Sequence, residues 1–299
     1  MRTRTARPAR RGRALLLAIA SVVTLVGLAT PASAGAAAIK TKTNVQYTVD
    51  GKPQLLDVYS PSKAAPNSRA VIFIHGGGWT GGSRTEWTND AKALAASGWV
   101  AFTIDYRVDS PTPYVREPAD VAAAVSWVQR NARTYNVDPA RIALVGASAG
   151  GHLAALAGMS GSGASGAPGR VKAVVSWSGP MDMAGMPSAY GCADMPCSFT
   201  TQWAAAKTQQ FEGSCLQTAC PDRWTSTSPI DQVAGAEPAV LLVNSTDEMI
   251  PLSQLTDMQE ALSAAGSPVS TQVLTGSAHG QGYHDVAWPT TVSFLQAVV

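Results

Sequence analysis

Short apolar runs alternate along most of the chain with stretches that have helical periodicity. The apolar runs lie at 70–74, 100–105, 141–145, 171–177, 239–244 and 269–274, after two shorter strand patterns at 44–47 and 55–59. Helical patterns fill 86–96, a segment that begins at Pro118, 252–264 and the last residues before Val299. Alternating strands and helices are typical of one mostly parallel sheet flanked by helices, so the sequence predicts an α/β fold.

This alternation fails between about 183 and 230, where Met, Trp, Phe, Ser and Cys are frequent. An insertion here is expected to act as a lid over the carboxyl ends of the strands, where open α/β sheets bind ligands. The segment holds all four cysteines, Cys192, Cys197, Cys215 and Cys220. In an exported chain they predict two disulfides, with metal binding as the alternative. Three pairings are open, and we favour Cys192–Cys197 and Cys215–Cys220 because each closes a small loop.

Two glycine-rich segments carry the candidate chemistry. Residues 146–150 have the pattern G-x-S-x-G between an apolar run and a helix of small residues, which predicts a nucleophile elbow that exposes the hydroxyl of Ser148 on a strained turn. The second segment, at 75–79, reads H-G-G-G-W and follows another apolar run. Its glycines let backbone N–H groups turn toward a ligand, so Gly77 and Gly78, with the N–H of Ala149, are the predicted donors of an oxyanion hole.

With these motifs the chain resembles α/β-hydrolases of the esterase and lipase group, which includes hormone-sensitive-lipase-like and feruloyl-esterase-like enzymes. The resemblance extends over roughly residues 43–299. It also includes L-D-V-Y at 56–59, D-Y-R at 105–107, P-A-D-V at 118–121, Y-N-V-D-P at 135–139 and S-G-P at 178–180, in the order that such enzymes show. The resemblance implies an α/β-hydrolase fold and a serine hydrolase that needs no metal or organic cofactor.

The resemblance also implies the partners of Ser148, because this fold orders its triad as serine, acid and histidine along the chain. The segment after 239–244 resembles a D-x-x-[VI]-P signature, which selects Asp247 as the acid in preference to its neighbour Glu248. The loop after 269–274 resembles G-x-x-H-G and selects His279 as the base, with His284 as the competitor. A zinc site at His279 and His284 is rejected, since no adjacent cysteine or further histidine completes it.

Aromatic and thioether side chains near the motifs and in the lid predict an apolar substrate pocket. The residues expected to bind substrate are Trp79, Trp177, Tyr190 and Trp203. Several methionines of the lid, together with Phe211 and Trp224, are expected to add to the pocket, or else to pack the lid onto the body.

The first 34 residues form a separate unit with six arginines, an apolar core and the sequence A-S-A at its end. This composition predicts a secretory signal peptide cleaved near Ala34, with an uncleaved anchor helix as the alternative. Residues 35–299 are then one secreted hydrolase domain. Without the leader the chain has 16 basic and 20 acidic residues, a net charge of −4. That balance gives no reason to expect nucleic acid or an anionic membrane as a partner, and the oligomeric state stays open.

Together these features predict a secreted serine esterase that acts on a small or polysaccharide-linked ester through an acyl-enzyme. An arylformamidase-like amide hydrolase is an alternative, because it would share both glycine motifs. A binding protein that keeps the hydrolase fold without catalysis is a third interpretation.

Overall fold

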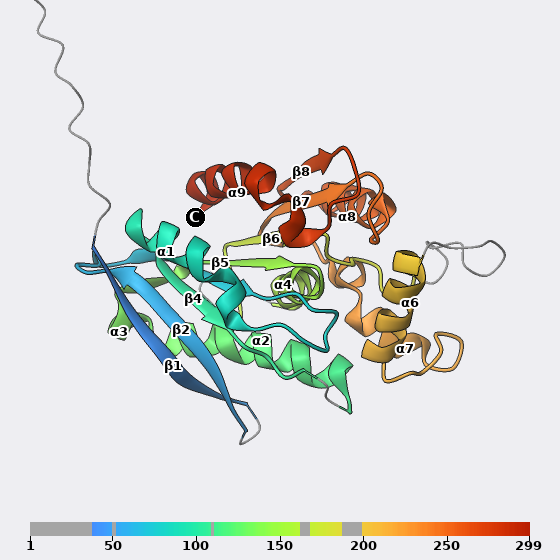
Figure 1. The fold of residues 1–299 in the computed structure, drawn as a ribbon, viewed down its shortest axis with the longest axis horizontal. Coiled ribbons are helices and arrows are strands. Elements are labelled where there is room, and N and C mark those ends of the chain that lie inside the picture. The colour runs from blue at the N-terminus through green and yellow to red at the C-terminus, as the bar shows by residue number, and fades with distance from the viewer. Residues whose placement is uncertain (1–37, 50–51, 109–110, 162–167, 187–198) are drawn as a thin grey trace, which may run out of the picture. The chain divides into compact units, whose positions relative to one another are not determined.

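The computed structural model describes residues 38–49, 52–108, 111–161, 168–186 and 199–299. Within them eight strands form one sheet in the order β1-β2-β4-β3-β5-β6-β7-β8 (Figure 1). The strands are β1 (Ile39–Val49), β2 (Lys52–Pro61), β3 (Ser68–Ile74), β4 (Val100–Ile104), β5 (Val137–Ala147), β6 (Ala173–Trp177), β7 (Ala239–Ser245) and β8 (Val269–Leu274). Strand β2 pairs antiparallel with β1 and β4, and all other neighbours are parallel.

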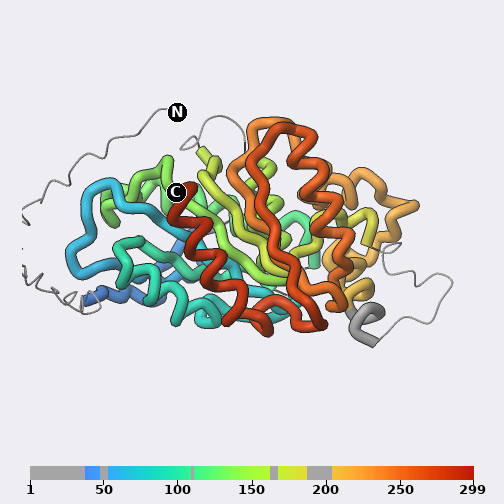
Figure 2. Tube along the Cα trace, turned by 90° about the horizontal axis from the view of Figure 1, so that it is seen from above, coloured from blue at the N-terminus to red at the C-terminus, as the bar shows by residue number. Residues whose placement is uncertain are grey.

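Helices cover both faces of this sheet. They are α1 (Thr88–Ala96), α2 (Pro113–Arg130), α3 (Ala132–Tyr135), α4 (Ala149–Ser160), α6 (Phe199–Phe211), α7 (Pro221–Thr227), α8 (Leu252–Ala264) and α9 (His284–Val298), with 3₁₀ turns η1 (Arg84–Trp87), η2 (Pro229–Gln232) and η3 (Gly280–Tyr283). Buried side chains of α2, α4 and α8 share one hydrophobic core, and those of α1 and α9 share another. Figure 2, seen from above, shows α9 as the red coil that leads to the C-terminus.

Strand β3 shows how the pattern of side chains makes the two cores. Successive side chains of a strand point to opposite faces. Ile72 accordingly packs in the core under α2, α4 and α8, whereas Val71 and Phe73 pack in the core under α1 and α9. Because both faces are buried, the strand reads in the sequence as a continuous apolar run, as expected of parallel strands.

The predicted α/β fold is confirmed, and so is a disulfide between Cys215 and Cys220. The insertion at 183–230 contains α6 and α7, and η2 begins at its end. The helix expected from Pro118 begins five residues earlier, at Pro113, so Pro118 lies inside α2. A proline at the first helical position is well tolerated because its missing N–H would have no partner there, and Pro113 meets that condition. Cys192, Cys197 and the predicted leader at 1–34 lie outside the described residues.

None of the helices in the described ranges is long and apolar enough to cross a membrane.

The first turn of α4 packs directly against the end of β3. A Cβ at Gly150 would lie 2.3 Å from the carbonyl oxygen of Ile74 and 2.4 Å from that of His75. Both atoms belong to the backbone, so neither can rotate away. The residue type at Gly150 therefore sets how closely the helix approaches the sheet.

We expect Gly150→Ala to lower the free energy of unfolding by about 1–3 kcal/mol, since the new methyl group must push α4 from β3. Gly81→Ala is the matched control, because the nearest atom to a Cβ there is 3.9 Å away. The control is expected to change stability by less than about 0.5 kcal/mol. Urea denaturation measures both, and equal effects would contradict the packing argument.

Candidate active site

Ser148 lies in the turn between β5 and α4. Its backbone angles are φ 53° and ψ −122°, a region that costs a non-glycine residue free energy. The turn is held because the Ser148 N–H donates to the carbonyl of Trp177 at 2.7 Å. A Cβ at Gly146 would lie 2.2 Å from the oxygen of Gly150, so the turn needs a glycine there. The structure thus has the strained turn that the G-x-S-x-G pattern predicts.

The glycine loop after β3 runs beside this serine. A Cβ at Gly76 would lie 3.5 Å from the Cβ of Ser148. Gly77 and Gly78 have φ values of 105° and 59°, which side chains rarely adopt. No hydrogen bond within the described ranges uses the N–H of Gly77, Gly78 or Ala149. The loop therefore presents backbone donors near Ser148, as an oxyanion hole requires.

The carboxylate beside His279 belongs to Glu248, and the expectation that Asp247 fills this place is wrong. The Nδ1 atom of His279 is hydrogen-bonded to Oε2 of Glu248, whose side chain is fully buried. The Asp247 side chain is exposed and accepts a hydrogen bond from the Thr246 hydroxyl at 2.7 Å. Successive residues leaving β7 point in different directions, and the sequence signature selected the one that faces solvent.

Three donors hold the buried carboxylate of Glu248. Besides His279, its Oε1 accepts from the Ser178 hydroxyl and from the Ser245 N–H, each at 2.8 Å. The same Ser178 oxygen accepts from the N–H of Gly280 at 2.9 Å. Ser178 therefore connects the acid to the loop that carries His279. Ser178 belongs to the S-G-P motif, which gives it no role, although a hydroxyl directly after the strand next to β7 is a detectable signal.

The Tyr283 hydroxyl lies behind this group of residues, 2.6 Å from the Ser178 oxygen and 3.0 Å from the carbonyl oxygen of Val243. Burial, with the nearby charge of Glu248, raises the pKa of Tyr283, which keeps the phenol neutral.

His284, the alternative base, lies elsewhere. Its Nε2 is 2.8 Å from Oδ1 of Asp90 on α1, and its ring stacks on Trp288.

Ser148 and His279 line one cavity of about 290 Å³. A Cβ at Gly280 would lie 4.0 Å from the Ser148 nitrogen, which shows how closely the histidine loop approaches the elbow. The complete lining is Gly76, Gly77, Gly78, Glu86, Ala147, Ser148, Met249, His279, Gly280 and Gln281. Three of these residues, Glu86, Met249 and Gln281, were not predicted from the sequence to be part of this site.

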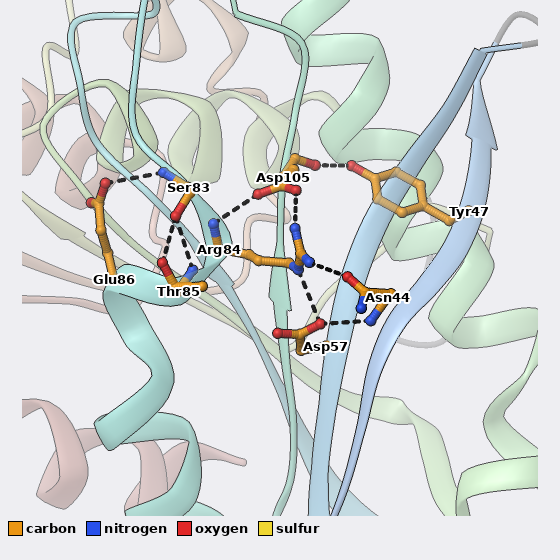
Figure 3. A network of polar contacts seen from close by, with 8 residues as sticks. All are labelled: Asn44, Tyr47, Asp57, Ser83, Arg84, Thr85, Glu86 and Asp105. Carbon is orange, nitrogen blue, oxygen red and sulfur yellow. Dashed lines mark hydrogen bonds and ion pairs between the residues drawn. The ribbon is translucent and has the colours of Figure 1, made fainter.

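A polar network anchors the far end of the glycine loop (Figure 3). Arg84 forms an ion pair with Asp57 of β2 at 3.0 Å and a second with Asp105, which follows β4. Its N–H also donates to Asp105 at 2.8 Å. Beside it, Ser83 and Glu86 form a capping box that starts η1. The loop is therefore tied to the sheet at both of its ends.

Trp79, predicted to bind substrate, instead joins the glycine loop to the lid. Its Nε1 donates to Nδ1 of His152 at 3.2 Å, and its ring packs on Phe211 of α6. The Nε2 of His152 donates to the Thr227 carbonyl at 2.8 Å. Burial lowers the pKa of His152 to about 4, so the ring is neutral and can accept and donate at once.

The other predicted substrate residues have different outcomes. Trp177 is fully buried, packs at a tilt against Trp87 and donates to the Thr291 hydroxyl at 3.0 Å, so the prediction that it binds substrate is wrong. Its position in β6 points it to the face covered by α1 and α9. Tyr190 lies outside the described residues, and of Trp203 only the backbone, in α6, is described.

The comparison with protein families agrees with this architecture. The model of the BD-FAE family matches residues 56–262, which is more than half of the chain. The chain belongs to the BD-FAE family. Among curated proteins, this BD-FAE member is 32% identical to esterase LipC of Mycobacterium tuberculosis over 77% of its own length and 58% of that protein. It is 28% identical to esterase LipQ of the same organism, over 79% of its own length and 56% of the length of LipQ. The chain spans a little more than half the length of these relatives.

Solved structures show the same fold. Thermogutta terrifontis esterase 2 phosphonylated by sarin superposes with a TM-score of 0.69 at 24% identity, covering 85% of this chain and 92% of that one. A truncated carbohydrate esterase from gut microbiota gives a TM-score of 0.67 at 26% identity, covering 86% of this chain and 95% of that one. The BD-FAE chain therefore has the α/β-hydrolase fold.

Glu212, at the end of α6, is a buried carboxyl group in the lid. Its Oε1 accepts from the Thr227 hydroxyl at 2.5 Å, and its Oε2 has no hydrogen-bond partner in the described part of the chain. Burial raises the pKa of Glu212 from 4.5 to about 7. Between these pH values the folded state holds a proton that the unfolded state has lost, so stability falls as pH rises through this window.

We expect Glu212→Gln to remove this dependence. The difference in unfolding free energy between the variant and the parent should move in favour of the variant from pH 4.5 to 7 and stay constant above that range. Urea denaturation at several pH values measures the difference. Glu260→Gln on the exposed face of α8 is the control and should give no such slope. Parallel curves for Glu212→Gln and the parent would contradict the prediction.

Proposed function

We propose that this chain is a secreted hydrolase of carboxylic esters that works through an acyl-enzyme on Ser148. One observation carries the proposal: the Glu248–His279 pair and Ser148 meet at one cavity beneath the glycine loop. The parallel strands β3, β5, β7 and β8 deliver these groups from their carboxyl ends. The names of the relatives, which are esterases and carboxylesterases, support the ester class.

The proposed first half-reaction uses the hydrogen bond between Glu248 and His279. The carboxylate can only accept, so Nδ1 of His279 carries the proton and Nε2 keeps a lone pair. That lone pair takes the proton of the Ser148 hydroxyl while Oγ attacks the ester carbonyl carbon. The N–H groups of Gly77, Gly78 and Ala149 stabilise the negative oxygen that forms. His279 then gives its proton to the departing alcohol, which leaves an acyl group on Ser148.

The second half-reaction repeats these steps with water. His279 takes a proton from water as the oxygen attacks the acyl carbon, and returns it to Ser148 as the acid departs. Glu248 stays ionised and stabilises the imidazolium in both halves. Its burial strengthens that interaction, because little solvent screens the pair.

The cavity indicates which esters fit. Its volume of about 290 Å³ is at the low end for ligand pockets, and Met249 supplies an apolar wall, so short acyl groups are favoured. The proposed substrates are short-chain esters, free or attached to a polysaccharide. Rates on p-nitrophenyl esters of increasing length, acetylated xylan, feruloyl esters and N-formyl aromatic amides test this proposal. A higher rate on the formyl amides would make the chain an arylformamidase-like hydrolase instead.

Ser148→Ala is expected to abolish ester turnover and to leave the unfolding transition in place, because the partly buried side chain loses only its hydroxyl. Mass spectrometry after treatment with an organophosphate should find one adduct on a peptide containing Ser148 in the parent and none in the variant. An adduct elsewhere, or more than a few per cent of residual activity, would refute this nucleophile.

Glu248→Gln should reduce kcat by about 10³–10⁴, because an amide can hold the His279 ring in the wrong tautomer. Asp247→Asn is the matched control at the neighbouring exposed position and should retain activity within about twofold. Rates of aryl acetate hydrolysis decide between them. The reverse ranking would return the acid to Asp247.

A further inference from the structure

A second cavity, of about 520 Å³, lies far from Ser148. One of its lining residues, Asn136, directly precedes β5, whereas Ser148 directly follows it. In the sheet register Val137 pairs with Ser68 of β3 and Gly146 pairs with Ile74, six residues further along β3, so the two cavities are about 20 Å apart along the sheet. The groups that line this second cavity therefore take no part in the proposed ester chemistry.

Three of the seven lysines of the chain, Lys40, Lys42 and Lys63, line this cavity. Lys40 and Lys42 are two residues apart in β1, so they lie on one face of the strand at a spacing of about 7 Å. Lys40 pairs with Ser60 of β2 in the sheet register, and Lys63 follows the end of that strand. The strand pair thus gathers three ammonium groups around one hollow.

These charges have no local compensation. Among the described residues, no ion pair or hydrogen bond engages the ammonium groups of Lys40, Lys42 or Lys63, and no carboxylate lines the cavity. Charges of one sign gathered in a concave site focus the electric field and attract counter-ions. The chain beyond the leader has a net charge of −4, so this concentration of positive charge does not follow from composition.

The remaining lining adds hydroxyl groups and one aromatic ring. Ser60, Thr134 and the Asn136 amide offer hydrogen bonds, and Tyr135 contributes a partly buried ring that also contacts Phe102. Ammonium groups at intervals along a strand suit repeated carboxylates, while hydroxyls and a ring suit the polar edges and apolar faces of sugar rings.

We propose that this cavity is a docking site for an acidic polysaccharide, whose carboxylates contact Lys40, Lys42 and Lys63. The site is separate from the cavity of Ser148 and holds the polymer without reacting with it. None of the exposed large apolar side chains, Val115, Leu216, Val273 and Val286, lines the cavity, so a lipid surface would find no group to insert into it. The single aromatic ring also offers little stacking for successive nucleic-acid bases.

Binding to polygalacturonate, with uncharged galactan as the neutral polymer, tests the proposal. The cavity variant is Lys40→Gln, Lys42→Gln and Lys63→Gln together. The control variant carries Lys92→Gln, Arg130→Gln and Lys172→Gln, which remove the same charge from exposed positions outside the cavity. A third variant with arginine at 40, 42 and 63 keeps the charge. Affinity electrophoresis gives the dissociation constants, and the thermal midpoint confirms that each variant is folded.

We expect the parent to bind polygalacturonate in low salt and not galactan. The cavity variant should bind about tenfold more weakly, since three partly exposed ion pairs are lost. The control and arginine variants should stay within about twofold of the parent, and added salt should weaken the parent's binding.

The proposal is overturned if the parent does not bind polygalacturonate, or if the cavity and control variants lose affinity equally. It is also overturned if the parent binds double-stranded DNA or phosphatidylglycerol vesicles more tightly than polygalacturonate through these lysines. Ester hydrolysis by the parent is measured separately, so failure of the proposed reaction and failure of this docking site are independent results.

Discussion

Direct contact between backbones, at the place where α4 begins, is the constraint on which the site depends. Gly146 and Gly150 let the turn at Ser148 close on itself and on the end of β3, with less room than one methyl group needs. This packing brings Ser148 beside Gly76. The positions of the serine and of the glycine loop therefore depend on the same backbone contacts. The strained backbone angles of Ser148 persist because the closely packed surroundings leave the turn no room to relax.

Burial of Glu248 is possible because its charge has enough partners. An ionised carboxylate without donors is costly inside a protein, and three donors from β6, β7 and the histidine loop satisfy this one. Ser178 has the central position, since one hydroxyl contacts both the acid and the backbone of Gly280. The orientation of His279 therefore depends on residues at the ends of β6 and β7 as well as on its own loop.

Much of this arrangement could be predicted from the sequence, and the failures have physical causes. Apolar runs identified the parallel strands because both faces of such strands are buried, and glycine spacing identified the elbow because only glycine fits there. The choice between Asp247 and Glu248 failed because the local backbone, not the residue type, decides which side chain turns inward. Trp177 was predicted to bind substrate because it is aromatic. Its side chain is two residues from Val175 in β6, so both point to the face of the sheet that α1 and α9 cover.

The position of Trp79 has a mechanical consequence. It directly follows Gly78 in the chain, and its ring is clamped between His152 of α4 and Phe211 of α6. Trp79 therefore connects the glycine loop to both α4 and α6, so a displacement of α6 would act on the residue that directly follows Gly78.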